Sequence, residues 1–131
     1  MTDDHLTTKQ KQVLQDSATE APFTGKLLNE KSEGKFQCAA CGNQLFESSS
    51  KFDSGSGWPS FDKSIPGSTK EITDSSLGMK RTEVVCAKCG GHLGHVFNDG
   101  PKETTGERFC VNSNSLDFVD TEGNKKSGAS D

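Results

Sequence analysis

Two matched cysteine motifs carry the clearest chemical signal. The chain contains Cys38-Ala39-Ala40-Cys41-Gly42 and Cys86-Ala87-Lys88-Cys89-Gly90, each a C-x-x-C-G unit that follows a strand-like run. The two-residue gap lets both sulfurs of a pair reach one ion, and the glycine permits the tight turn that aims backbone amides at a thiolate. We therefore predict one zinc ion bound by four thiolates, those of Cys38, Cys41, Cys86 and Cys89. Such a site is structural, because four protein ligands leave no position for a substrate.

Three other interpretations of these cysteines fit less well. A redox-active pair would need a cysteine at the start of a helix, and neither pair precedes a convincing helical pattern. A mixed site of Cys86, Cys89, His92 and His95 would leave the first pair without a role, and the H-x-x-H spacing is tighter than usual for ligating histidines. Ordinary buried thiols would not explain two matched pairs with matched glycines.

The fifth cysteine, Cys110, lies in a strand-like run with polar neighbours. Because side chains alternate along a strand, Arg108, Cys110 and Asn112 share one face, whereas Phe109 and Val111 point into the core. A nearby guanidinium favours the thiolate, which is the nucleophilic form of cysteine. A lone cysteine in a strand is more often an inert small hydrophobe, but the polar face favours a nucleophile here.

Two further runs contain residues suited to the same chemistry. His95, Phe97 and Asp99 lie on one face of a strand and its turn, where His95 could donate a proton and Asp99 could orient it or pair with Arg108. The same run also reads as a simple capped hairpin. Trp58 stands in a loop of glycines and a proline, which suits either a pocket wall or a plug over the core.

Short alternating runs separated by Gly, Ser, Asn and Pro predict a mainly β fold, with two antiparallel sheets forming a small sandwich or rolled barrel. The predicted strands are Lys35–Cys38, Gln44–Glu47, Lys70–Thr73, Lys80–Cys86, Leu93–Phe97, Glu107–Val111 and Leu116–Val119. Residues 1–20 are expected to form an arm with a short helix, capped by Thr7 and Gln10 and carrying Val13 and Leu14 inward. Residues 121–131 have nothing obvious to bury and are expected to form a mobile tail of this single domain, 1–131.

Composition limits the classes of function. Leu, Ile, Val and Phe supply only 24 of 131 residues, so we expect the zinc ion to add stability to a thin core. The formal net charge of −4 argues against nucleic-acid binding. The chain has no apolar run long enough for a membrane span, and residues 1–10 are too polar for a signal peptide. The chain has an odd number of cysteines, five, and we expect a cytoplasmic protein with reduced thiols. We also expect a monomer.

Three motifs in order resemble the type B peptide methionine sulfoxide reductases: Gly57-Trp58-Pro59-Ser60-Phe61, Gly91-His92-Leu93-Gly94-His95-Val96-Phe97 and Arg108-Phe109-Cys110-Val111-Asn112-Ser113. The resemblance also includes the cysteine pairs and the run from Thr19 to Gly25, and it extends from about Leu6 to Val119. It implies a zinc-stabilised barrel-like body of two antiparallel sheets. It also implies reduction of the R epimer of methionine sulfoxide in oxidised proteins, since each epimer has its own enzyme.

The resemblance also implies roles for individual residues. Cys110 would be the nucleophile and would become a sulfenic acid, and Trp58 would be the wall beside the substrate methyl group, with Phe97 in the same substrate-binding site. His92, His95 and Asn112 would surround the sulfoxide oxygen, and His95 would be the acid that donates the proton. Asp99 and Arg108 would tune the thiolate.

One position departs from the family pattern. Many members have a resolving cysteine two residues before the tryptophan, where this chain has Ser56. We therefore expect an external thiol to reduce the sulfenic acid, supplied by thioredoxin, by glutaredoxin with glutathione or by a small dithiol. A binding module without chemistry is the main alternative, and it would have no need for Cys110. A zinc hydrolase or deaminase would need an open metal position, which four thiolates exclude.

Overall fold

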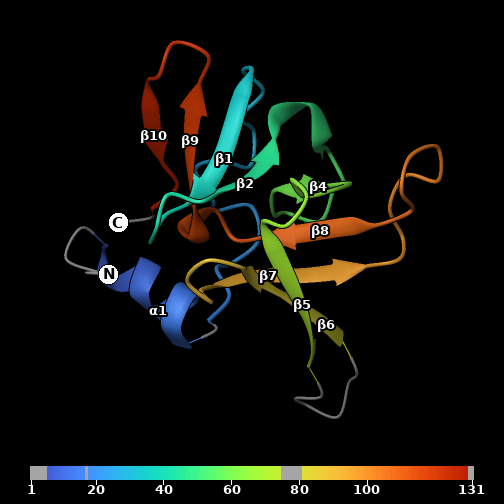
Figure 1. Cartoon of the computed structure of the whole chain (residues 1–131), viewed down its shortest axis with the longest axis horizontal. Coiled ribbons are helices and arrows are strands. Elements are labelled where there is room, and N and C mark those ends of the chain that lie inside the picture. Colours follow the sequence, from blue (N-terminus) through green and yellow to red (C-terminus); the bar gives the residue numbers. More distant parts are fainter. Residues whose placement is uncertain (1–5, 17, 75–80, 130–131) are drawn as a thin grey trace.

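Two antiparallel sheets make up most of the structure. It is a computed structural model, and it describes residues 6–16, 18–74 and 81–129. The first sheet has the strand order β10-β9-β1-β2 and the second has the order β3-β4-β8-β7-β6-β5 (Figure 1). The first contains β1 (Gly34–Cys38), β2 (Gln44–Glu47), β9 (Leu116–Asp120) and β10 (Lys125–Ser127). The second contains β3 (Lys51–Phe52), β4 (Ser60–Phe61), β5 (Thr69–Asp74), β6 (Arg81–Cys86), β7 (His92–Phe97) and β8 (Arg108–Val111). The predicted mainly β architecture of two antiparallel sheets is confirmed.

All seven predicted strands are present, and their described ends agree with the prediction to within one residue. The predicted start of one strand, Lys80, lies outside the described residues. The two-residue strands β3 and β4 were not predicted, because a run of two residues carries no periodicity. Two short 3-10 turns, η1 (Ser48–Ser50) and η3 (Ser113–Ser115), precede β3 and β9.

Part of the expected mobile tail forms the edge strand β10. It pairs with β9 from Lys125 opposite Val119 to Ser127 opposite Asp117, and its side chains are all exposed. The next residue, Gly128, donates its backbone N–H to Leu116 O at 3.0 Å, and Ala129 is buried. Backbone hydrogen bonds therefore hold this segment without an apolar side-chain pattern that the sequence could reveal.

The predicted capped helix is α1 (Thr8–Asp16). Thr7 N–H donates to Gln10 Oε1 at 2.9 Å and Gln10 N–H donates to Thr7 Oγ1 at 3.1 Å, which is the reciprocal pattern of a capping box. Val13 and Leu14 are buried, as predicted. The helix lies against β7 and η3, so the N-terminal arm packs at one end of the second sheet (Figure 1).

Phenylalanine side chains from both sheets form the centre of the core. Phe36 in β1 meets Phe61 in β4 edge-on at 5.0 Å between ring centroids, and Phe46 in β2 stacks on the same ring at 4.2 Å. Phe118 and Phe109 contact this group from β9 and β8. Because each buried aromatic ring removes a large apolar area from water, few residues suffice to join the sheets.

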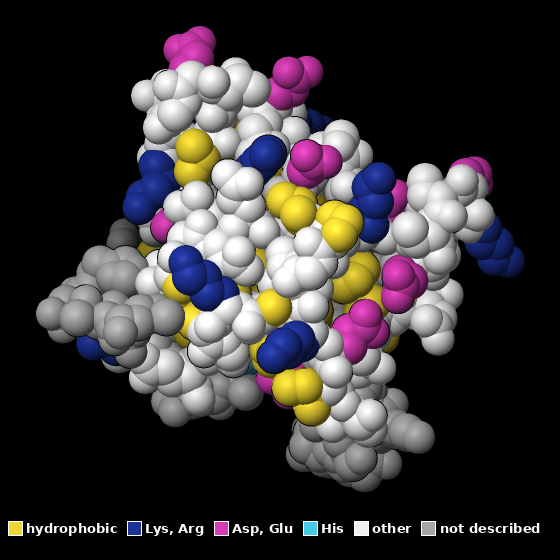
Figure 2. Space-filling view, viewed as in Figure 1, with side chains coloured by type: hydrophobic (Ala, Val, Ile, Leu, Met, Phe, Trp, Pro, Cys, Tyr) yellow, Lys and Arg dark blue, Asp and Glu magenta, His cyan; other side chains and the backbone are white. Residues whose placement is uncertain are grey.

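The outer surface shows no single dominant charge on the face seen in Figure 2. Lys and Arg side chains lie among Asp and Glu side chains there, and hydrophobic side chains are scattered over the face with several gathered near its centre. Among the described residues, no helix is both long and apolar enough to cross a membrane.

Candidate active site and four-cysteine centre

The four paired cysteines meet at one point. Cys38 Sγ lies 3.6 Å from Cys89 Sγ, Cys41 Sγ lies 3.6 Å from Cys86 Sγ, and all four sulfurs are within 4.8 Å of one another. A tetrahedral zinc site with Zn–S bonds of about 2.3 Å has S···S separations of about 3.8 Å. The donor set and the spacing therefore fit a four-thiolate metal site, as predicted.

The two C-x-x-C-G turns have the same backbone geometry. Gly42 N–H donates to Cys38 O, and Gly90 N–H donates to Cys86 O, both at 2.8 Å. Both glycines have a φ of 78°, a left-handed conformation that favours glycine. One turn joins β1 to β2 in the first sheet and the other joins β6 to β7 in the second, so a bound ion would link the two sheets.

The four thiols also influence one another's ionisation. A hydrogen bond with Cys38 lowers the pKa of Cys86 to about 4, and the same contact raises the pKa of Cys38. Burial raises the pKa of Cys89 to about 11. Four neighbouring thiolates are therefore unfavourable by themselves, and a divalent ion would compensate their charge as the protons leave.

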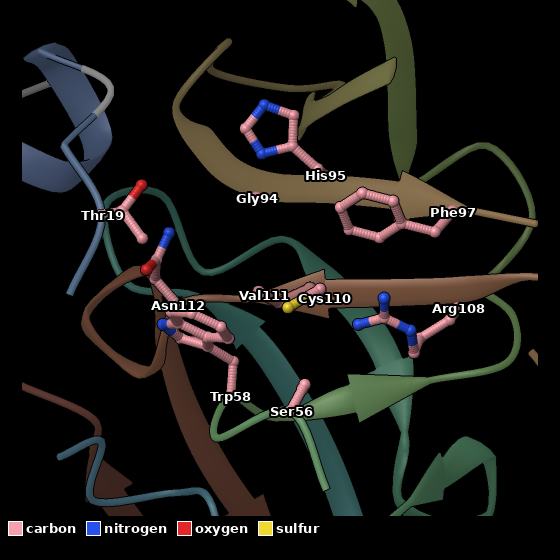
Figure 3. Close-up of a pocket in the computed structure, with 10 residues that line it drawn as sticks. All are labelled: Thr19, Ser56, Trp58, Gly94, His95, Phe97, Arg108, Cys110, Val111 and Asn112. Atoms are coloured by element: carbon pink, nitrogen blue, oxygen red, sulfur yellow. The ribbon is translucent and has the colours of Figure 1, made fainter. Parts of the chain in front are cut away.

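The remaining cysteine opens into a separate cavity of about 250 Å³ (Figure 3). Its walls come from the segment before β4, from β7, from β8 and from the chain after α1. The lining residues are Thr19, Ser56, Trp58, Gly94, His95, Phe97, Arg108, Cys110, Val111 and Asn112. Trp58, Phe97 and the Arg108–Cys110–Asn112 face therefore converge on one cavity with His95.

Strand register aligns the polar side chains of this site. Ser60 in β4 is opposite Cys110 in β8, which is opposite His95 in β7, which is opposite Glu83 in β6. Directly opposed residues of antiparallel strands point to the same face of a sheet. Gly94 allows the close approach of β7 and β8, because a Cβ at this position would meet Cys110 O at 1.9 Å.

A β-bulge brings the two histidines of the H-x-x-H run to the same face. In a regular strand, residues three apart point to opposite faces, but the β6–β7 register shifts between Val84 and Val85 and leaves Leu93 as the extra residue. The rings of His92 and His95 consequently lie 5.6 Å apart. A mixed metal site with Cys86 and Cys89 does not form among the described residues.

His92 occupies a different place from the other predicted site residues. It is buried and is absent from the lining of the cavity, whereas the resemblance implies a position beside the sulfoxide oxygen. Its Nδ1 donates to Glu83 Oε2 at 2.7 Å. The His92 imidazole therefore lies behind the His95 ring rather than in the wall of the cavity. Sequence reasoning did not identify Glu83, the partner of His92, as a residue of the site.

Arg108 connects Asp99 to Cys110. Its Nε and Nη2 donate to the two carboxylate oxygens of Asp99 at 2.8 and 3.3 Å, and its guanidinium carbon lies 4.6 Å from the centroid of Phe97. Of the two partners considered for Asp99, the structure thus selects Arg108. The hydrogen bond from Arg108 lowers the pKa of Asp99.

Burial raises the pKa of the Cys110 thiol, and the charge of Arg108 and hydrogen bonds from Ser56 and Arg108 lower it. Burial is the larger contribution. The predicted help from the guanidinium is therefore present, but in the substrate-free protein it only partly offsets the cost of ionising a thiol in this partly enclosed cavity.

Glu20 and Asn112 hold the tryptophan side of the cavity. Trp58 Nε1 donates to Glu20 O at 2.9 Å, while Glu20 N–H donates to Asn112 Oδ1 at 3.0 Å. Asn112 Nδ2 donates to Leu93 O at 3.1 Å, and the buried Glu20 carboxylate accepts from the backbone and side chain of Asn114. The sequence offered one signal for Glu20, its place in the run from Thr19 to Gly25 that carries part of the resemblance.

Comparison with known proteins identifies the family. The SelR domain matches residues 6–120. The protein named peptide methionine sulfoxide reductase MsrB from Leifsonia xyli subsp. xyli is 55% identical over 86% of this chain and 82% of the relative. The protein of the same name from Variovorax paradoxus is 57% identical over 82% of this chain and 79% of the relative. The protein of that name from Leptospira interrogans is 54% identical over 86% of each chain. The resemblance seen in the motifs is therefore confirmed, and the chain belongs to the SelR family of type B peptide methionine sulfoxide reductases.

Proposed function

We propose that this chain reduces methionine-R-sulfoxide in oxidised proteins, with Cys110 as the nucleophile. The observation that carries the proposal is the convergence of Cys110, His95 and Trp58 on one cavity of about 250 Å³. A thiol, a proton donor and an aromatic wall are the three groups that sulfoxide reduction needs, and here three separate segments of the chain bring them together.

In the proposed step, the Cys110 thiolate attacks the sulfoxide sulfur while His95 donates a proton to the sulfoxide oxygen. The attack forms an S–S bond between Cys110 and the substrate sulfur. The S–O bond of the substrate then breaks as the protonated oxygen moves to the Cys110 sulfur, and the S–S bond breaks at the same time, which leaves Cys110 as a sulfenic acid. The substrate sulfur gains the two electrons that the Cys110 sulfur loses, so methionine leaves as the product. Attack requires protonation at oxygen because an unprotonated sulfoxide sulfur is a weak electrophile.

The indole of Trp58 stabilises the substrate as positive charge develops. Its Nε1–H is already bound to Glu20 O, so the ring is held by its edge and a face remains for the methyl group. Protonation of the oxygen makes the sulfur sulfonium-like, and an aromatic face attracts that charge more than the neutral ground state. Phe97 lines the same cavity and also packs on Arg108.

Three residues position the reacting groups without contacting the substrate sulfur in this scheme. Asp99 fixes the Arg108 guanidinium, whose charge favours the thiolate. Glu83 fixes the His92 ring behind His95. Asn112 lines the cavity and orients the Trp58 side through Glu20.

An external thiol completes the cycle. Ser56 occupies the position of the resolving cysteine of other members, and the four other cysteines are gathered in the metal centre. A reductant thiol would attack the sulfenic acid and release water, and a second thiol would then resolve the mixed disulfide. Thioredoxin or another dithiol reductant can supply both thiols. The metal centre would hold zinc, which supplies structural stability when bound.

A single-turnover experiment without added thiol tests the proposal. We expect one equivalent of methionine-R-sulfoxide to yield methionine and to add one oxygen atom to Cys110, detected by mass spectrometry of the intact protein and its peptides. Methionine-S-sulfoxide serves as the substrate control and should yield neither product. The Cys110→Ser variant should be inactive. Retained turnover in this variant, or an intramolecular disulfide involving Cys110, would contradict the mechanism.

A further inference from the structure

We propose that a second cavity beside Trp58 binds an apolar residue that neighbours methionine sulfoxide in the substrate polypeptide. The inference rests on the proposed function and adds a preference for the sequence around the oxidised methionine. The cavity has a volume of about 520 Å³, and its apolar lining is Phe23, Leu28, Phe52 and Trp58. It is therefore large enough for a bulky side chain.

Trp58 lines both cavities, so the two adjoin at this residue. A polypeptide whose sulfoxide lies against one side of this ring has its neighbouring residue only about 3.8 Å away along the chain, measured between Cα atoms. The second cavity is thus within reach of a side chain adjacent to the reacting methionine. A free amino acid has no such side chain to place there.

Phe23 is the most unusual residue of this second cavity. Its side chain is 69% exposed, and it is the only non-glycine among the described residues with a positive φ, 65°. Its backbone N–H donates to Gly57 O at 2.7 Å. The fold therefore holds an aromatic ring in solvent with an unfavourable backbone conformation, which is a pattern associated with binding sites.

Gly57 explains how the ring reaches the active-site loop. Its φ is 95°, and a Cβ at this position would meet Pro22 Cβ at 2.7 Å and two ring atoms of Phe23 at 3.0 Å. The Phe23 ring therefore packs directly on the backbone next to Trp58. Any larger residue at position 57 would displace it.

Charge around the cavity favours an apolar occupant over a charged one. Two lysines and two acids line it, Lys31 and Lys51 with Glu30 and Asp53, so neither sign dominates. Lys51 donates its Nζ to Leu28 O at 2.6 Å, and Glu30 pairs with Lys126. With these two groups already bound, Phe23, Phe52 and Trp58 supply an aromatic contact for an apolar side chain within this mixed lining.

Peptides that differ only beside the methionine test the proposal. Two blocked pentapeptides carry methionine-R-sulfoxide at the centre, one with leucine on both sides and one with serine on both sides. We expect the wild-type chain to prefer the leucine peptide by about tenfold in kcat/KM, because burying two or more methylene groups is worth about that factor. We expect the Phe23→Gly variant, which suits the positive φ, to reduce the preference to about twofold or less.

Two control variants make the result specific. Phe23→Leu keeps an apolar side chain and should retain most of the preference, whereas Ile72→Ser removes another exposed hydrophobic residue, in β5 and outside this cavity, and should retain all of it. Thermal unfolding of each variant checks the fold. An equal leucine and serine rate in the wild-type chain, or an unchanged preference in Phe23→Gly, would overturn the proposal.

Three further outcomes separate this inference from its alternatives. If Phe23→Gly slows only the reduction of the sulfenic acid by thioredoxin, the cavity receives the reductant and the substrate proposal is overturned. If the wild-type chain reduces neither the peptides nor free methionine-R-sulfoxide, the proposed function itself fails. Reduction of free methionine-R-sulfoxide without any peptide preference overturns only the inference.

Discussion

Replacing Arg108 by methionine should weaken the proposed nucleophile, Cys110, without emptying the cavity wall. The methionine chain would still pack on Phe97, but the positive charge next to Cys110 would be lost. Since Arg108 lowers the pKa of this thiol, the variant should have a higher pKa and less thiolate at neutral pH.

Coulomb's law gives the size of the effect. Two charges about 4 Å apart interact by roughly 1 kcal/mol in water and by roughly 4 kcal/mol at the effective dielectric constant near a protein surface. The Arg108 side chain is 16% exposed, and Asp99 neutralises part of its charge, so a value of about 1.4 kcal/mol near the lower limit applies. That energy corresponds to a tenfold change in the ratio of thiolate to thiol, because 1.36 kcal/mol is about one pKa unit.

Alkylation of Cys110 by iodoacetamide measures this ratio directly. The Arg108→Met rate at pH 7 should be about tenfold below wild type, and the two rates should converge at alkaline pH where both thiols ionise. Arg108→Lys, which keeps the charge but loses the paired contacts with Asp99, should lose less. Superimposable pH profiles for wild type and Arg108→Met would refute the electrostatic role of Arg108.

Three other perturbations test separate parts of the site. The purified chain should contain one zinc ion, which Cys41→Ser or a strong chelator should remove. Loss of the ion should sharply lower the midpoint of thermal unfolding, because a structural zinc site contributes on the order of 10 kcal/mol to folding. An unchanged midpoint after metal loss would contradict this. Glu83→Gln should lower kcat about tenfold with little effect on KM and should alter the pH profile, while Glu47→Gln on the exposed side of β2 should do neither. In the Ser56→Cys variant, the new thiol should form a disulfide with Cys110 after one turnover, because the Ser56 hydroxyl is within hydrogen-bonding range of Cys110. Mass spectrometry should detect the disulfide as the loss of two hydrogen masses. A stable sulfenic acid in that variant would argue against this contact.

Local patterns in the sequence were sufficient for much of the fold and the site. Alternation identified the face shared by Arg108, Cys110 and Asn112, and repeated C-x-x-C-G units identified the four-cysteine centre. Both signals arise from residues close together in the chain, where spacing alone determines direction.

Long-range pairing accounts for what the sequence did not reveal. Glu83 meets His92 only because β6 pairs with β7 in one register and because a bulge at Leu93 turns His92. The net pKa of Cys110 depends on how deeply the thiol is buried, which the alternation pattern does not specify. β10 forms through backbone contacts with β9, so its exposed side chains gave no signal.

The straight row from Ser60 through Cys110 and His95 to Glu83 makes catalysis sensitive to slippage between strands. Deleting Arg108 from β8 would invert the pleat of the residues that follow, turning the Cys110 sulfur toward the phenylalanine-filled interior and the Phe109 ring toward the cavity. Changes of length between Asn98 and Glu107, in the connection between β7 and β8, leave this alignment intact. Evolution can therefore vary the length of that connection as long as Asp99 stays paired with Arg108, while the length of each flanking strand is as constrained as the identity of the proposed nucleophile.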